Sequence, residues 1–301
     1  VVIATDIGDA GTVLESGSRK LVGTTGWVGG CDNADHVLLL VDSEAILVDV
    51  NASGVTVSPR PLSTFGLRSL AFNTLRFDDV PLDGSNSGVS LLGSHLDSEK
   101  AAVDLDFIMT GVYAGSLKRI IQLGHFYTSR RKVYGGLLIK KPFTVAVLSQ
   151  MLYLNVAFDQ SITWLPSLKA KDDQTGSVWT SAATAVMSEV CIWAADRGIN
   201  LLGGRGYADN NPMSQVWRDT RMLQQYTCPM TTVFVQVGRL SEDAVQQVLS
   251  ARLQKWHHEF RSQLQSQLGG MSMDDDHAQA CLDHKSGHIL SWLVLLQSFD
   301  Q

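Results

Sequence analysis

Residues 200–221 of this chain read NLLGGRGYADNNPMSQVWRDTR, and the rest of the sequence can be ordered around them. An apolar run compatible with a helix, residues 178–202, ends in a glycine cluster at 203–206. Pro212 then suits the first turn of a further helix, where its missing N–H costs nothing. Glycines at such a junction adopt positive φ and allow backbone amides to face an anion. The junction is therefore either an anion-binding turn or an ordinary helix C-cap followed by a linker.

Composition bounds the class of protein. The chain has 301 residues, 45% of them hydrophobic and 18% charged, which is typical of a soluble globular protein with one or two domains. A net charge of −6 argues against nucleic acid as the main partner. No run of 18 apolar residues is present, so we expect no membrane span.

Cysteine and histidine usage favours a cytoplasmic protein without a metal site. The four cysteines, Cys31, Cys191, Cys228 and Cys281, show neither CxxC nor metal-ligand spacing and are expected to be free thiols in a reducing compartment. The chain starts with Val and carries no signal-peptide pattern. His284 and His288 have i,i+4 spacing, which suits either a metal pair or a solvated helix face.

The hydrophobic period changes from about two to helical spacing near residue 98. Before it, short apolar runs at 37–41, 45–50, 55–57 and 69–77 predict strands, with a hairpin turn at 42–44 and an exit loop from Pro81 to Gly88. After it, we expect helices at 98–130, 142–170, 175–202, 212–226, 229–265 and 276–299. The sequence thus predicts an α+β chain: a small antiparallel β-barrel or sandwich at 1–97, a helical bundle at 98–268, and a linker with a last helix at 269–301.

The stretch at 200–221 resembles a motif of the acyl-CoA dehydrogenase family, Q-x-x-G-G-x-G-[YF] followed by P and R-D-A. Other segments resemble family motifs in the same order along the chain: GWVGG…ADHV at 26–37, LRFDDVPL at 75–82, VDLD at 103–106 and RKVYG at 131–135. No part of the chain resembles the family's N-terminal helical domain. The resemblance implies a β-domain and a C-terminal four-helix bundle with FAD between them, in a homodimer or homotetramer.

The resemblance also implies roles for individual residues. Arg131 of RKVYG would contact the flavin pyrophosphate across a subunit interface, and a guanidinium suits that contact because it pairs bidentately with phosphate. Trp27 would pack on the isoalloxazine. The alternatives are a surface cation and a core aromatic. The other cofactor-binding candidates that the resemblance implies are Thr5, Gly29, Tyr134, Asn200, Gly203 and Gly204, with Gly29 in place of a flavin-facing threonine.

The chain departs from the family pattern at the catalytic base. The family's R-D-x-x-x-x-x-Y-E-G-T run places a glutamate where this chain has Thr227, and a threonine hydroxyl cannot accept a proton near neutral pH. Some relatives place the base on the substrate-facing helix, where Asp106 falls here. Asp106 is therefore a candidate catalytic base, with an exposed or helix-capping carboxylate as the alternative. Phe107 replaces an arginine, and Pro142 stands where an F-Q motif is expected.

Three functions follow from these expectations. The first is FAD-dependent α,β-dehydrogenation of an acyl thioester, with a non-standard base. The second is a non-redox relative whose cavity takes a different substrate. The third is a structural subunit in a heteromer with a full-length dehydrogenase. Bound flavin would favour the first, and its absence would favour the other two.

Overall fold

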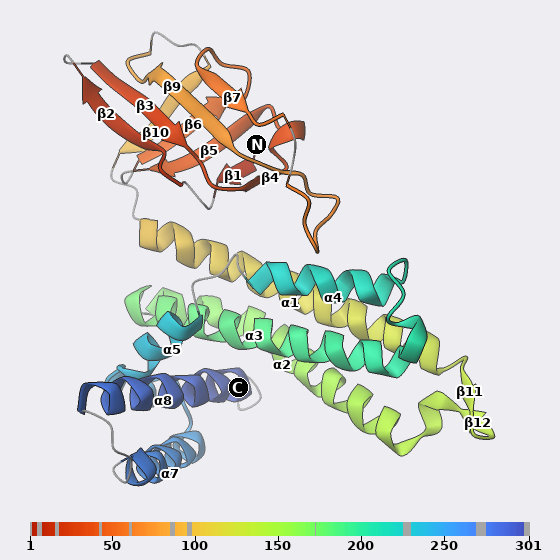
Figure 1. Ribbon diagram of the computed structural model, residues 1–301. Helices are drawn as coiled ribbons and strands as arrows, with labels where there is room; N and C mark the ends of the chain where they lie inside the picture. Colours follow the sequence, from red (N-terminus) through yellow and green to blue (C-terminus); the bar gives the residue numbers. More distant parts are fainter. Residues whose placement is uncertain are drawn as a thin grey trace. The chain divides into compact units, whose positions relative to one another are not determined.

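The computed structural model divides the chain into two compact units, Val1–Ala101 and Ala102–Gln301 (Figure 1). It describes residues 2–4, 8–15, 18–41, 44–59, 62–84, 88–94, 98–171, 173–224, 230–268 and 275–297. Strands give way to helices at Ser98, the first residue of α1. The predicted fold class, an antiparallel β region followed by a helical domain, is confirmed.

Two four-stranded sheets make up most of the first unit. Their strand orders are β1-β5-β6-β10 and β2-β3-β9-β7, and a two-stranded sheet pairs β4 with β8. The bounds are β1 Val2–Ala4, β2 Gly11–Glu15, β3 Ser18–Thr24, β4 Val28–Gly29, β5 His36–Val41, β6 Glu44–Asp49, β7 Val55–Val57, β8 Phe72–Asn73, β9 Leu75–Pro81 and β10 Val89–Ser94. The β1–β5 pair is parallel, and the other described pairs are antiparallel.

Apolar side chains from both four-stranded sheets form one core. In β5, Val37, Leu39 and Val41 alternate with less buried neighbours, the period expected of a strand with one buried face. They share a cluster with Ile46 of β6 and Leu75 of β9. The apolar runs predicted β5 and β6, and the packing of the two sheets decides which of their side chains are buried.

One irregularity in β9 explains a break in this alternation. Phe77 and Val80 are both buried although they are three residues apart. Between them Asp79 has φ 51°, and the register with β3 shifts between Leu21 and Gly23. This is the pattern of a β-bulge, which adds one residue and returns the strand to the same face.

Two strand predictions need correction. The strand expected at 69–77 is divided into β8 and β9, because Thr74 lies between them and only β9 joins a four-stranded sheet. The loop before Gly88 was expected to leave the β-domain, but β10 follows it and pairs with β6. Pro81 belongs to β9, and part of the loop lies outside the described residues.

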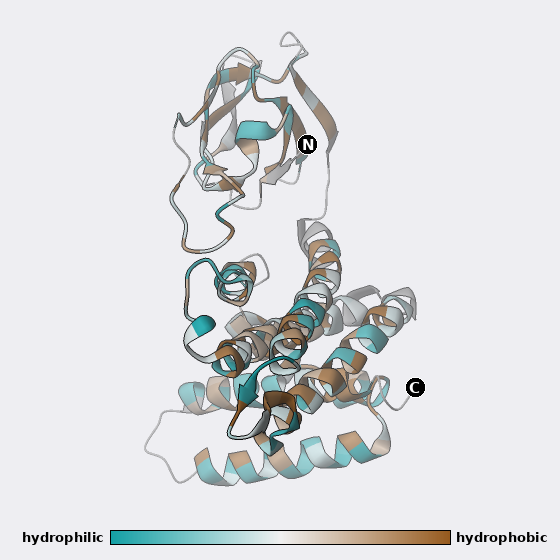
Figure 2. Ribbon diagram, turned by 90° about the vertical axis from the view of Figure 1, so that its right-hand side faces the viewer, coloured by the Kyte–Doolittle hydropathy of each residue, from teal (hydrophilic) through white to brown (hydrophobic). Residues whose placement is uncertain are grey.

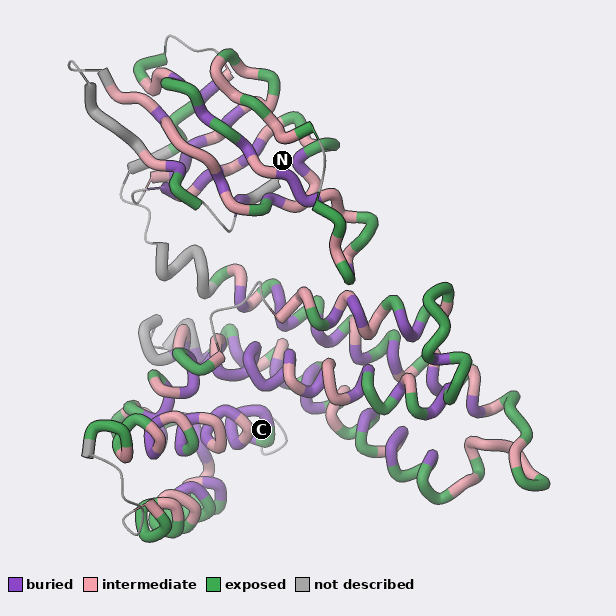
Figure 3. The backbone as a smooth tube through the Cα atoms, viewed as in Figure 1, coloured by how far each residue is buried: buried purple, intermediate pink, exposed green. Residues whose placement is uncertain are grey.

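The second unit is a helical bundle centred on α3. Figure 3 shows α3 buried along most of its length, and side chains such as Ala182, Val186 and Ala194 lie in the core. The bounds are α1 Ser98–Thr128, α2 Pro142–Lys171, α3 Asp173–Leu202, α4 Pro212–Leu223, α5 Met230–Gly238, α6 Glu242–Gln246, α7 Ala251–Leu268 and α8 Asp275–Gln297. By length and composition α3 could cross a membrane, but 72% of its apolar window is buried inside the protein, as in a core helix.

The prediction of a single helix at 229–265 is wrong, because three helices, α5, α6 and α7, lie in this part of the chain. At the end of α5, Gly238 lies so close to α8 that an added Cβ would clash with the backbone oxygen of Asp283. Ser241 then starts α6 by accepting a hydrogen bond from the N–H of Ala244 at 3.2 Å. The close packing of α8 ends α5, and the Ser241 N-cap begins α6. The apolar pattern of the sequence continues through both positions and so does not show this break.

The last helix is part of the bundle. It was expected as an extension after a linker, but α8 packs against α5, α7 and α3. Gly287 of α8 allows the closest approach, because an added Cβ would clash with the backbone oxygen of Phe234 on α5. Figure 2 shows hydrophobic and hydrophilic residues interspersed along the helices of this unit. The expected linker at 269–274 lies outside the described residues.

Candidate functional site

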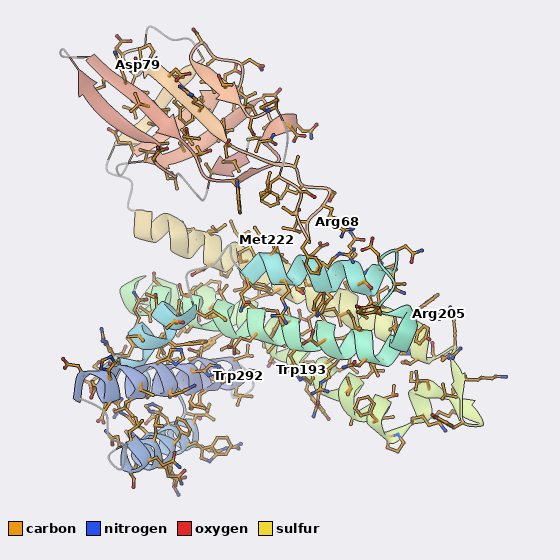
Figure 4. The ribbon with its side chains drawn as sticks, viewed as in Figure 1. Arg68, Asp79, Trp193, Arg205, Met222 and Trp292 are labelled. Atoms are coloured by element: carbon orange, nitrogen blue, oxygen red, sulfur yellow. The ribbon has the colours of Figure 1, made fainter. Side chains whose placement is uncertain are left out.

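The junction between α3 and α4 is a tightly bonded loop with an open glycine turn. After α3 a short 3-10 helix, η3 Gly203–Arg205, carries Gly203 at φ 59°. No heavy atom lies within 4 Å of where a Cβ would stand at Gly203 or Gly204. Arg205 lies at this end of α3 in Figure 4. Asn200 is exposed in the last turn of α3. The glycine turn is therefore accessible, as an anion-binding turn requires.

Side chains of α4 hold the loop that follows. Ser214 donates hydrogen bonds to the backbone oxygens of Gly206 and Ala208. The Arg218 guanidinium, largely buried, pairs with the Asp209 carboxylate at 2.9 Å. Asn211 caps α4 by accepting from the N–H of Met213 at 2.8 Å. The helix start predicted at Pro212 is confirmed, and these bonds fix the loop next to the glycine turn.

A two-residue hairpin presents the RKVYG motif. β11 Lys132–Val133 pairs with β12 Gly136–Leu137, and the turn residues Tyr134 and Gly135 both have positive φ, 49° and 76°. Two positive φ values define a type I′ turn, which matches the twist of a hairpin. The Tyr134 side chain is 92% exposed.

Arg131 stands at the base of this hairpin. Its backbone bonds to Tyr127 and Leu138, and its side chain is exposed without an ion pair in the described part of the chain. The hairpin and the glycine turn belong to the same end of the bundle, because Gly124 near the end of α1 packs toward Leu201 at the end of α3. The structure thus brings Arg131 to the end that carries Gly203 and Gly204.

Asp106 occupies a different environment. It is 2% exposed, on the face of α1 that packs against α3. One carboxylate oxygen accepts a hydrogen bond from Ser181, and its backbone oxygen accepts one from Thr184 at 3.1 Å. Burial raises the pKa of this carboxyl, and the Ser181 hydrogen bond lowers it in part. Asp106 is thus neither the exposed nor the helix-capping residue considered as its alternative role.

The two described candidates of the β-domain differ in what surrounds them. Trp27 is 54% exposed, so it is not a core aromatic. Gly29 pairs with Phe72, and an added Cβ would stand 2.7 Å from a methyl carbon of Leu70. A threonine would not fit there without movement of Leu70. Thr5 lies outside the described residues.

The segment that replaces the family's glutamate run is anchored on both sides. Thr227 and its neighbours at 225–229 lie outside the described residues. Before them, the backbone oxygen of Leu223 accepts a hydrogen bond from the Tyr113 hydroxyl at 3.0 Å. After them, the Met230 sulfur lies 3.5 Å from the Ser188 hydroxyl. Pro142 forms the first residue of α2, and Phe107 packs against the bundle core.

The histidine pair on α8 is partly buried against α5. The His288 ring nitrogen Nε2 lies 2.9 Å from a carboxylate oxygen of Glu189, and the rings of His284 and His288 both pack on Phe234. Among the residues that the structure describes, no three potential ligands gather around a common point.

The sequence patterns did not identify the side chains that hold the loop after α3 and the carboxylate of Asp106. Arg218 could have been found from the sequence, because it belongs to the RDTR string after the loop and lies on the buried side of α4. Ser181 carried none, because it is 75 residues from Asp106 and only the packing of α1 on α3 joins them.

Residues 106–227 match the family model for the acyl-CoA dehydrogenase C-terminal domain. This part of the chain contains Asp106, the hairpin and the glycine turn. This match and the relatives that follow make the chain similar to proteins of the acyl-CoA dehydrogenase family. It is 23% identical over 236 residues to the mitochondrial short-chain specific acyl-CoA dehydrogenase of Mus musculus, covering 73% of this chain and 56% of that protein. The chain thus spans little more than half the length of this relative.

Two solved structures show the same fold. An acyl-CoA dehydrogenase from Bacillus anthracis, complexed with FAD, aligns with a TM-score of 0.74 and 18% identity over 97% of this chain and 57% of its own. A glutaryl-CoA dehydrogenase from Mycobacterium smegmatis, in complex with FADH2, aligns with a TM-score of 0.59 and 17% identity, over 74% of this chain and 61% of its own.

Proposed function

We propose that this chain is a member of the acyl-CoA dehydrogenase family that binds FAD and catalyses α,β-dehydrogenation of an acyl thioester with a non-standard base, as a homodimer or homotetramer or with a related subunit. The observation that carries the proposal is the end of the bundle where the unpaired Arg131 and the open turn at Gly203 and Gly204 occur together. The flavin in the Bacillus anthracis structure supports the same cofactor for this chain.

The residues present fit the phosphate-bearing part of FAD. A phosphate needs a cation without a competing carboxylate and room for close approach. Arg131 supplies the cation, because no described acid pairs with it. Gly203 and Gly204 supply the room, since their Cβ directions are open. Asn200, Tyr134 and the half-exposed Trp27 are the remaining described residues assigned to the cofactor, while Leu70 fills the Cβ direction of Gly29.

Bound FAD would supply a hydride acceptor. The chain must then supply a base for the α-proton, and Asp106 is our candidate. Burial raises the pKa of its carboxyl, which moves a carboxylate toward the range a general base needs at neutral pH. In this role Ser181 would hold the carboxylate in position through the hydrogen bond to one oxygen, leaving the other oxygen to take the proton.

A second candidate function is a relative that keeps the fold without dehydrogenation. The bonds of Asp106 to α3 favour it, because a carboxylate 2% exposed and bonded to Ser181 also serves as an internal link between two helices. The threonine at position 227 favours it as well, since general-base assistance is typically worth about 10²–10⁴-fold in rate. Such a protein would act on a different substrate or complete a heteromer.

Two measurements separate these functions. The visible absorption spectrum of the purified protein tests for flavin, and anaerobic bleaching by acyl-CoA tests for dehydrogenation. Bleaching that is lost in Asp106→Asn would support the first function with Asp106 as base. Flavin that no acyl-CoA reduces would support the second, and turnover that survives Asp106→Asn would remove Asp106 from the mechanism.

The cofactor contact has its own test. Arg131→Ala should weaken FAD binding by about 1.5–3 kcal/mol, the usual cost of losing a hydrogen bond to a charged group. Lys132→Ala is the matched control, because it removes the same charge from an exposed neighbour. Equal FAD affinity in the two variants, measured by fluorescence titration, would contradict the assignment of Arg131.

A further inference from the structure

A small pocket lies between α6 and α7, in the C-terminal part of the helical unit. Its cavity volume is about 30 Å³, which is room for one small polar group such as the head of an oxyanion. Leu240 and Val245 form an apolar wall, and Arg261, His257, His258 and Glu242 bring polar groups to it. None of these residues takes part in the proposed flavin chemistry.

His257 is the buried polar group of this pocket. Its side chain is 4% exposed, and its ring nitrogen Nε2 lies 2.8 Å from the Ser286 hydroxyl on α8. The other ring nitrogen, Nδ1, is buried and has no hydrogen-bonding partner among the described residues. Buried polar atoms are nearly always paired, so a ring nitrogen without a described partner, on a residue that lines a pocket, points to a missing partner.

The charges around His257 indicate the kind of partner. Burial first, and then the nearby charges of His258 and Arg261, together lower the pKa of His257 to about 4, so the ring is neutral near pH 7. When the Ser286 hydroxyl donates to Nε2, the proton of the neutral ring is on Nδ1, which becomes a buried donor. Arg261 forms no ion pair in the part of the chain that the structure describes, so its guanidinium is available.

We propose that this pocket binds a small molecule through one oxyanion, a carboxylate or a phosphate, with Arg261 as the charge partner and the Nδ1–H of His257 as the buried donor. A guanidinium matches the geometry of either oxyanion. Glu242, on the α6 side, accepts a hydrogen bond from a hydroxyl or ammonium group of the same ligand and repels ligands of higher negative charge. The proposal does not depend on flavin binding.

NMR of the full chain tests the proposal, with ¹⁵N-labelled histidine and long-range ¹H–¹⁵N correlation to identify the His257 tautomer. Inorganic phosphate and acetate are the two probes, titrated separately at constant ionic strength. We expect a saturable shift of the His257 ring signals with the proton on Nδ1. Tighter binding of phosphate would indicate a phosphate ester as ligand, and tighter binding of acetate would indicate a carboxylic acid.

Two variants of α7 decide the role of the charge. Arg261→Met should raise the Kd at least about 10-fold, because a charge-assisted hydrogen bond is lost. Lys255→Met removes the same charge from an exposed position of α7 outside the pocket lining, and should change the Kd less than about 2-fold. The absence of a saturable shift with both probes, or equal affinity in the two variants, would overturn the proposal.

Discussion

Helices of the same unit meet in two different ways. Between α1 and α3, a buried carboxylate at Asp106 accepts a hydrogen bond from Ser181, so side chains make the contact. Between α5 and α8, Gly238 and Gly287 let backbone approach backbone, and carbonyl oxygens occupy the places of the missing Cβ atoms. A side-chain contact can relax when one partner changes. A backbone contact cannot, so we expect the α5–α8 crossing to tolerate far less substitution.

The largest expected effect is at the glycine crossing. Gly287→Ala should destabilise the protein by about 3 kcal/mol or more, because the new methyl group clashes with the Phe234 backbone oxygen and must push α5 and α8 apart. Urea unfolding followed by circular dichroism measures the change. A loss below about 1 kcal/mol would mean that the crossing is as adaptable as the α1–α3 contact.

The contact between α7 and α8 that includes His257 should contribute less to the free energy of unfolding as the pH falls. The folded pKa of His257 is lowered from 6.5 to about 4, so its contribution is complete above pH 6.5 and is lost as the pH falls toward 4. At about 1.4 kcal/mol per pKa unit, the loss is on the order of 3 kcal/mol. His257→Gln should remove this part of the pH dependence of unfolding, and an unchanged profile would show that other groups cause it.

The α1–α3 contact should show a smaller effect and the opposite pH dependence. Removing one hydrogen bond from a buried carboxylate costs about 1–3 kcal/mol, so Ser181→Ala should destabilise by this amount at pH 7. In an Asp106→Asn background the same change should cost less, since no charge is then left without a donor.

The sign of the Asp106 titration provides a second measurement. Burial raises the folded pKa of this carboxyl above 3.8, so its stabilising contribution is present below that value and is lost as the pH rises through the raised pKa. Asp106→Asn should flatten this part of the stability profile. A variant profile parallel to that of the wild type would contradict the shift.

The smallest effect is expected at a glycine without a neighbour. Gly115 of α1 has no heavy atom within 4 Å of its Cβ position. Gly115→Ala should therefore stabilise the protein by about 0.5–1 kcal/mol, through helix propensity and a less flexible unfolded chain. The contrast with Gly287→Ala in the same unfolding assay separates glycines that the crossing needs from glycines that it does not.

The sequence alone determined the order of the elements and the features that depend on neighbouring residues. Short apolar runs predicted β5 and β6, the change of period predicted the start of α1, and Pro212 predicted the start of α4. The glycine turn after α3 was also visible, because positive φ and open space are local properties that glycine permits. The resemblance to the acyl-CoA dehydrogenase family rested on short motifs in a fixed order.

Only the tertiary structure decided what depends on residues far apart in the chain. It divided the range 229–265 into three helices, because the approach of α8 limits α5 at Gly238. It gave Asp106 a partner on α3 and left Nδ1 of His257 without one among the residues that the structure describes. Burial sets the pKa values of these two groups, and burial results from the packing of whole helices. Local sequence patterns carry no information on that packing, so side-chain chemistry was predictable from the sequence but its environment was not.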